Sequence, residues 1–323
     1  MPPQPAQLIF GGASFGPSMS SAFSSPAATA TALDLLHAAG VRKIDTARFY
    51  PDSEEYLGQC GAAARFDIDT KYPGGFAPTP SSKEGIVRSV EESLAALRTD
   101  KVDVYYIHAP DRRVPLEDLL STLNALHAAG KFARLGLSNF LADEVLDVLR
   151  ICKENGYVAP SVYQGNYNAV ARLSEAALLP ILREHGIAYY AYSPIAGGFL
   201  TKDVEALEAA SGEGRWDPGT ATGGIFTALY AKPAMLEGLR VWGRIAAEAG
   251  VARAELAYRW VAFHSVLRGE LGDGLVFGSR DVRQLEGTLE GLAKGPLPED
   301  VVQRIEGVWE LVREDAPVDN FNR

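Results

Sequence analysis

Eight short apolar segments, rich in β-branched and aromatic residues, alternate with helical patterns along the chain. Strands that alternate with helices usually pair in parallel, because each helix carries the chain back to the same edge of the sheet. Eight such units without a linker predict an α/β fold, a closed (β/α)8 TIM barrel that takes up residues 1–323 as a single domain. The predicted strands are residues 8–10, 41–45, 66–70, 102–107, 133–137, 161–164, 187–191 and 274–277.

The segments between these strands carry apolar residues at helical spacing. The clearest is 81–97, where Ile86, Val90, Leu94 and Leu97 fall on one face. The other predicted helices are residues 28–39, 53–64 with Ser53 as a cap, 116–129, 142–154, 174–185, 233–249, 252–264, 282–292 and the C-terminal 298–314, which a short tail follows.

Residues 195–232 break the alternation. Glycines interrupt every pattern in this stretch, including Gly197-Gly198 and Gly223-Gly224. A segment of this length without regular structure is usually functional or disordered when it lies inside a compact domain. We therefore predict a long loop after the seventh strand.

The composition excludes several classes of function. The formal net charge of -10, without a basic cluster, argues against nucleic acid or an anionic membrane surface as a partner. Two cysteines, Cys60 and Cys152, do not form a disulfide framework, and the first residues lack a signal-peptide pattern, so we predict a cytoplasmic protein. No apolar run is long enough to cross a bilayer. The five histidines are scattered and no HExxH pattern occurs, so we predict no metal.

Polar residues follow two of the predicted strands closely and end a third. Asp45, Lys71 and His108 would meet at one mouth of a parallel barrel, and Tyr50 would reach it from a loop. Such a set suits proton donation to a carbonyl group. An ammonium beside a phenol favours the phenolate, a carboxylate balances the buried ammonium, and the histidine orients the carbonyl oxygen. Taken singly, these residues are more often a cap, a solvated lysine and a packing histidine; their occurrence together favours catalysis.

Six fragments of the sequence resemble the aldo-keto reductase family, and most closely its aflatoxin-aldehyde reductase branch. The resemblance implies an oxidoreductase that reduces aldehydes or ketones to alcohols by hydride transfer from NADPH, with Tyr50 as the proton donor. The fragments are IDTARFY (44–50), DTKY (69–72), YIHAPD (106–111), GLSNF (136–140), VYQGNYN (162–168) and AYSPIAGGFL (191–200).

The resemblance also implies where the cofactor lies. The chain has no G-x-G-x-x-G, so a Rossmann cradle is not supported. Ser138, Asn139 and Gln164 match the residues that hold the nicotinamide amide, and Tyr192 matches an aromatic residue that stacks on the nicotinamide. For the first two, the alternative is that they only start the next helix. The matching residues that follow Tyr192 are Ser193, Pro194, and, in a loop across the pyrophosphate, Gly197, Gly198, Leu200 and Lys202, although these glycines also suit a plain flexible loop.

The phosphates are expected near two arginines. Arg215 corresponds to a basic residue near the phosphates in the most similar branch. Gly278, Ser279 and Arg280 precede a helix whose N-terminus suits a phosphate, and Arg280 is the candidate for the 2′-phosphate, unless it is only a solvated surface arginine. A preference for NADPH over NADH follows. The residues that match the adenosine end are Gln284 and Thr288, and the threonine departs from the asparagine that many family members carry there.

The substrate is expected to be a neutral aldehyde or dione. Some members of the branch take aldehydes with a carboxylate, which basic residues of the long loop and the C-terminus meet. Here residues 216–230 contain no lysine or arginine, and only Arg323 of that basic set remains. His108 and Arg323 are the substrate-binding candidates, and Arg112 or Arg113 could replace the missing charge.

Three other interpretations stay open. The same groups could oxidise an alcohol, or the chain could be a non-catalytic cofactor-sensing subunit of the same fold. An unrelated TIM-barrel enzyme is the third possibility. The presence of all four proton-transfer residues argues against a sensor, and the family-like fragments argue against an unrelated barrel. A homodimer is possible.

Overall fold

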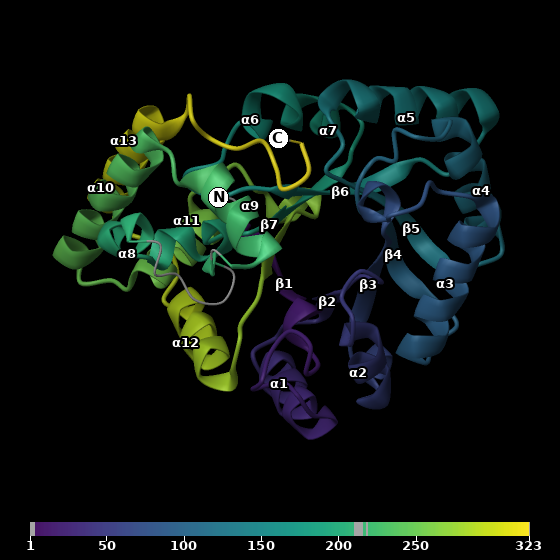
Figure 1. Cartoon of the computed structure of the whole chain (residues 1–323), viewed down its shortest axis with the longest axis horizontal. Coiled ribbons are helices and arrows are strands. Elements are labelled where there is room, and N and C mark those ends of the chain that lie inside the picture. Colours follow the sequence, from purple (N-terminus) through teal and green to yellow (C-terminus); the bar gives the residue numbers. More distant parts are fainter. Residues whose placement is uncertain (1–3, 210–215, 218, 323) are drawn as a thin grey trace.

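The strands form one closed parallel barrel. The computed structural model describes residues 4–209, 216–217 and 219–322. Each strand pairs in parallel with its neighbour in sequence, and β8 pairs with β1 to close the ring (Figure 1). The predicted (β/α)8 barrel is confirmed. The strands are β1 (Gln7–Gly11), β2 (Lys43–Asp45), β3 (Asp67–Tyr72), β4 (Val102–Ile107), β5 (Phe132–Ser138), β6 (Pro160–Asn166), β7 (Ala188–Tyr192) and β8 (Gly274–Phe277).

Helices surround the barrel and cover the outer face of its strands (Figure 1). In the helix over residues 83–97, Ser82 accepts a hydrogen bond from the Gly85 N–H at the start, and the four apolar residues predicted to share a face are all buried. The helices are α1 (Pro26–Ala38), α2 (Ser53–Gln59), α3 (Lys83–Leu97), α4 (Leu116–Ala128), α5 (Ala142–Asn155), α6 (Ser174–Ala177), α7 (Leu179–Glu184), α8 (Val204–Glu208), α9 (Ala221–Tyr230), α10 (Pro233–Ala249), α11 (Arg253–Phe263), α12 (Val282–Ala293) and α13 (Glu299–Val312).

Two predicted helices are shorter or broken. The helix predicted over 53–64 ends at Gln59, because Gly61 adopts a left-handed backbone with φ +63°. Ser53 is not its cap. Ser53 is the first helical residue, and its hydroxyl donates to the Gly12 carbonyl. The helix predicted over 174–185 is two short helices, α6 and α7, and Pro180 stands at the start of the second.

The prediction that residues 195–232 form a loop is wrong in part, because α8 and α9 lie within them. The Thr220 side chain caps α9. Phe226 and Tyr230 of α9 pack against Trp216, and all three rings are buried. Burial of these rings outweighs the poor helix propensity of the glycines that misled the prediction.

The middle of the barrel is filled by apolar and aromatic side chains. Gly136 leaves space for one of them, since a Cβ at this position would lie 2.3 Å from the Tyr106 ring. Charged side chains lie above and below this layer, at the two ends of the strands. The members of the layer are Ile9, Val104, Tyr106, Val162, Ala188, Tyr190 and Val276.

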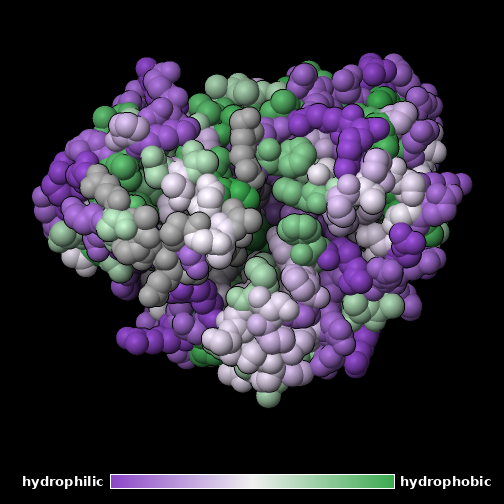
Figure 2. Space-filling model, viewed as in Figure 1, coloured by the Kyte–Doolittle hydropathy of each residue, from purple (hydrophilic) through white to green (hydrophobic). Residues whose placement is uncertain are grey.

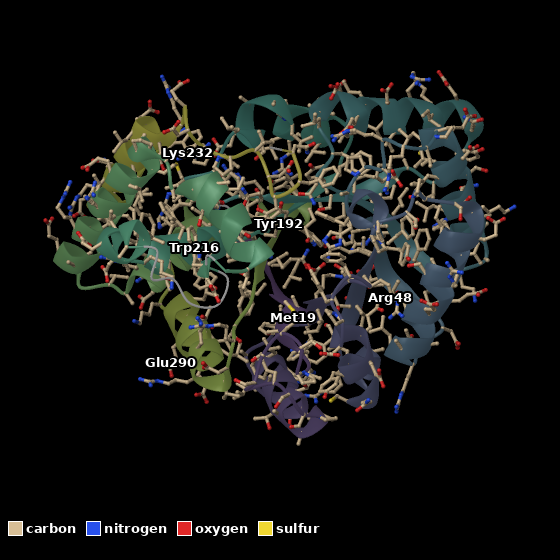
Figure 3. The ribbon with its side chains drawn as sticks, viewed as in Figure 1. Met19, Arg48, Tyr192, Trp216, Lys232 and Glu290 are labelled. Carbon is tan, nitrogen blue, oxygen red and sulfur yellow. The ribbon has the colours of Figure 1, made fainter. Side chains whose placement is uncertain are left out.

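The face seen in Figure 2 is mostly polar, with a hollow near its centre that hydrophobic residues border. In the same view, Tyr192 at the C-terminal end of β7 lies at this centre (Figure 3). The hollow therefore marks the mouth of the barrel. Across the described ranges, no helix combines the length and the apolar character needed to cross a membrane.

Candidate active site

A buried ion pair lies at the mouth. The Lys71 Nζ is 2.6 Å from each carboxylate oxygen of Asp45 and 2.8 Å from the Thr46 carbonyl oxygen. Lys71 is 0% exposed and Asp45 is 3% exposed. Gln164, from the opposite side of the barrel, donates to the same carboxylate at 2.8 Å. These bonds satisfy most of the hydrogen-bonding capacity of both ions, which is what a desolvated ion pair needs to be tolerated.

Tyr50 lies beside this pair in the loop after β2. Its ring centroid is 5.7 Å from the Lys71 Nζ, and the side chain is partly exposed. Its ring meets that of His108 edge-on, with centroids 5.9 Å apart. A phenol next to a buried ammonium, at an edge that solvent reaches, is suited to release a proton there.

His108 follows β4 and carries a neutral imidazole. Burial and the nearby Lys71 ammonium lower the pKa of His108 well below its usual value. Its Nδ1 is buried and has no partner among the described residues. The imidazole is held by Phe76, whose ring centroid lies 5.0 Å away. A neutral imidazole can donate one hydrogen bond to a carbonyl oxygen without competing for the proton.

The residues predicted to hold the nicotinamide amide lie at the same mouth. Asn139 has a left-handed backbone with φ +60°, and its amide donates to the His108 carbonyl oxygen at 2.8 Å. The Tyr192 hydroxyl donates to the Asn139 Oδ1 at 2.7 Å. Ser138, 1% exposed, accepts a bond from the Asn139 amide. The structure thus brings Ser138, Asn139, Gln164 and Tyr192 together around the tetrad of Asp45, Tyr50, Lys71 and His108.

The loop after β7 begins next to them. Ser193 has φ +55°, and Gly197 and Gly198 have φ of +64° and +100°, so the backbone turns sharply here. The Trp216 indole donates to the Gly197 carbonyl oxygen at 3.0 Å, and Trp216 lies to the left of Tyr192 in the view of Figure 3. Pro194 and Leu200 are buried, whereas Lys202 is partly exposed and its carbonyl accepts a bond from Arg253.

The predicted phosphate end lies between β8 and α12. Ser279 is buried, and its hydroxyl has no partner among the described residues. Arg280 is exposed, and its backbone N–H donates to the Gln284 side chain at 2.7 Å. The Thr288 hydroxyl donates to the Gln284 carbonyl oxygen within the helix. Arg215 and Arg323 lie outside the described residues.

The two arginines after His108 are already engaged. Arg112 makes two bonds to Glu144, at 2.6 and 3.1 Å, and one to Asn322. Arg113 donates to Asp111 and to backbone carbonyl oxygens of residues 77–79. Both guanidinium groups are therefore already paired with carboxylates of the chain itself.

Sequence reasoning missed an aromatic wall beside His108. Phe76 stacks on Phe49 and meets Phe321 edge-on, with centroids 5.6 and 5.1 Å apart. The C-terminal tail reaches the site as well, because the Asn322 amide donates to the Asn139 carbonyl oxygen at 2.9 Å. Only Phe49, next to Tyr50 in the sequence, carried a local signal. Within the described residues no group of three or more His, Cys, Asp or Glu could hold a metal ion.

Comparison with known proteins places these residues in context. The model of the aldo/keto reductase family matches residues 7–310. The oxidoreductase sirO of Leptosphaeria maculans is 41% identical over 287 residues, which cover 88% of this chain and 86% of that protein. An aldo-keto reductase of Pseudocercospora fijiensis is 38% identical over 289 residues, or 87% and 97% of the two chains. Human aflatoxin B1 aldehyde reductase member 4 is 37% identical over 292 residues, or 86% and 87%.

Proposed function

We propose, from the premise that the chain belongs to the aldo/keto reductase family, that it reduces aldehydes or ketones to alcohols with NADPH and that Tyr50 donates the proton. The resemblance predicted from the sequence, including that to aflatoxin-aldehyde reductases, is confirmed. Family membership supports an oxidoreductase that acts on carbonyl groups. The observation that carries the finer proposal is that the Tyr50 ring lies close to both the buried Lys71 ammonium, at 5.7 Å, and the ring of the neutral His108, at 5.9 Å.

The residues around the mouth fit a nicotinamide cofactor. The buried hydroxyl of Ser279, which has no partner among the residues that the structure describes, lies just before the N-terminus of α12, where a phosphate would be favoured. At the other end, Ser138, Asn139 and Gln164 offer both donors and acceptors to an amide. A reduced nicotinamide supplies hydride to the carbonyl carbon.

Each catalytic residue has one task in this mechanism. His108 donates a hydrogen bond to the carbonyl oxygen and so orients it. Tyr50 gives its phenolic proton to that oxygen as negative charge develops there. Lys71 stabilises the phenolate that remains. Asp45 pairs with the Lys71 ammonium, and Gln164 holds Asp45 in place through a hydrogen bond.

The same groups can act in reverse, with the Tyr50 phenolate as a base, and the chain would then oxidise alcohols. A cofactor-sensing subunit would not need the phenol beside the ammonium. The deciding experiment follows NADPH consumption at 340 nm with a panel of aldehydes, ketones and dicarbonyls. Turnover of several carbonyls supports the proposal, and tight NADPH binding without turnover of any of them contradicts it.

We predict tighter binding of NADPH than of NADH. A guanidinium pairs strongly with the 2′-phosphate when desolvated and weakly when exposed, and Arg280 is exposed before any cofactor binds. Substitution Arg280→Ala is expected to remove an NADPH preference of about tenfold, as measured by fluorescence titration of both cofactors. Arg244→Ala on α10 is the matched control. Equal affinity of the unmodified protein for NADPH and NADH refutes the prediction, and loss of the preference in Arg215→Ala alone assigns it to Arg215.

We also predict a preference for neutral over acid-bearing carbonyl compounds. Phe49, Phe76 and Phe321 form the wall next to His108, and Arg112 and Arg113 already bind Glu144 and Asp111. A carboxylate buried there without a partner costs several kcal/mol, and each ~1.4 kcal/mol is a tenfold loss in kcat/KM.

The measurement compares kcat/KM for an ω-aldehyde acid and for its amide, which has the same shape but no charge. We expect the amide to be preferred by about tenfold or more. A higher value for the acid would show that a cation meets it. Arg112→Met then tests whether that cation is Arg112.

A further inference from the structure

A second buried ion pair lies directly below the catalytic one. The Lys43 Nζ is 3.1 Å from the Asp69 Oδ1, and the two side chains are 6% and 0% exposed. Asp45 and Asp69 are register partners on β2 and β3. Because β2 reads Lys-x-Asp and β3 reads Asp-x-Lys, these two neighbouring strands supply both ion pairs, Lys43–Asp69 and Asp45–Lys71.

Only one of the two carboxylate oxygens of Asp69 is hydrogen-bonded in the described part of the chain. Its Oδ1 accepts bonds from Lys43 and from the Val104 N–H at 3.3 Å, whereas its Oδ2 is buried without a partner in the described part of the chain. Burial, with repulsion from Asp45 and Asp103, raises the pKa of Asp69 to about 7 despite the attraction of Lys43. Its charge therefore changes near neutral pH.

Titratable side chains from β2, β4 and β7 also face Asp69. From β4, Tyr106 remains a neutral phenol because burial raises its pKa, and Asp103 remains ionised because Arg134 and Lys43 lower its pKa. From β7, burial raises the pKa of Tyr190, whose hydroxyl accepts a bond from Arg134 at 3.3 Å. The pKa of Lys43 is raised by Asp69, Tyr190 and Asp103, against the effect of its burial. The remaining facing ions are Asp45 and Lys71.

We propose that Asp69 is a positioning residue that acts through Asp45 and Lys71 to set the pH range in which Tyr50 donates its proton. The proposal rests on the proposed function. An ionised Asp69 repels the negative charge that forms when Tyr50 loses its proton. The Tyr50 phenol therefore stays protonated up to a higher pH when Asp69 is ionised. A neutral side chain at the same place removes that opposition and lets the phenol ionise earlier.

Four variants test the coupling between Asp69 and Tyr50 by the direction in which each one moves the alkaline limb of the pH profile. Asp69→Asn is expected to move the alkaline limb of the kcat/KM profile to lower pH by about half a unit to one unit, the effect of a single charge at an intermediate dielectric. Lys43→Gln removes the opposite charge and should move the limb to higher pH. The double variant Asp69→Asn with Lys43→Gln should lie between the two, near the unmodified protein.

Asp103→Asn is the matched control. Asp103 also pairs with Lys43, but its side chain is 22% exposed and already paired with Arg134, so its loss should move the limb much less. If Asp69 has a purely structural role, Asp69→Asn and Asp103→Asn should both lower the activity, and neither should move the alkaline limb of the pH profile. An unmoved limb in Asp69→Asn, or equal movement in Asp103→Asn, overturns the proposal. If Asp69→Asn does not fold, the shift in Lys43→Gln decides, and no upward movement overturns it.

A second measurement separates this proposal from the proposed function. Phenolate absorbance near 295 nm, after subtraction of the same titration in Tyr50→Phe, follows ionisation of Tyr50 without turnover. The shifts between variants should match those of the kinetic profiles. If no carbonyl compound is reduced but the absorbance shifts follow the expected signs, the function is wrong and the coupling stands. Absorbance titrations that coincide in all variants refute the coupling.

Discussion

Replacement of Tyr50 by Phe is expected to lower kcat by about 10²–10⁴-fold, the usual contribution of a general acid. The substitution removes only the hydroxyl. The ring remains to face the Lys71 Nζ at 5.7 Å and the His108 ring at 5.9 Å, so the surrounding geometry is kept. Steady-state kinetics with a neutral aldehyde gives kcat, and fluorescence titration shows whether NADPH affinity is unchanged.

Tyr56→Phe is the matched control for this experiment. Its hydroxyl donates to the Ser24 carbonyl oxygen on the outside of the barrel, so its loss should change kcat by less than about twofold. Turnover of Tyr50→Phe within a few-fold of the unmodified enzyme would eliminate Tyr50 as the proton donor. A combined loss of turnover and of NADPH affinity would indicate a binding role instead.

Replacement of Lys71 by Met is expected to remove most turnover and to lower the free energy of unfolding by about 3–5 kcal/mol. The stability loss arises because Asp45 would remain as a buried carboxylate without its cation. Thermal or denaturant unfolding measures the stability, and kcat measures the catalytic loss. The double variant Asp45→Asn with Lys71→Met removes both charges, so it should regain much of the stability but none of the activity.

Lys294→Met serves as the surface comparison. Lys294 pairs with Glu255 at 2.8 Å but is 58% exposed, so its loss should cost less than about 1 kcal/mol. A small stability loss in Lys71→Met, similar to that of Lys294→Met, would show that Asp45 is better solvated than its burial indicates. Retained turnover in Lys71→Met would eliminate the ammonium from the mechanism.

The barrel could be predicted from local patterns because each strand and each helix can be recognised from the spacing of apolar residues over a short stretch of sequence. The alternation of β-rich runs with amphipathic helices places the elements, and the rule that parallel strands share one mouth brings their C-terminal residues together. Asp45, Lys71 and His108 could be grouped in this way before any contact was known. The predicted roles of these residues stay predictions until the variants are measured.

Local patterns failed where contacts between residues far apart in the sequence determine the structure. Glycines argue against a helix over residues 221–230, but burial of Phe226 and Tyr230 against Trp216 stabilises one. Likewise, Phe76 and Phe321 lie 245 positions apart on the chain, and no local signal joins them. Asp69 reads as an ordinary polar residue in a strand until its register with Asp45 is known.

The sequence by itself determined the order of the elements, the barrel they form and the four side chains that meet at its mouth, because periodicity and strand ends are local properties. Only the tertiary structure decided which charges are neutralised and which remain. It directs Arg112 and Arg113 to other partners, uses the Thr288 hydroxyl inside its own helix, and leaves one oxygen of Asp69 unpartnered within the described barrel. Burial and pairing depend on residues far apart in the chain, and these interactions set the electrostatics on which the chemistry of Tyr50 depends.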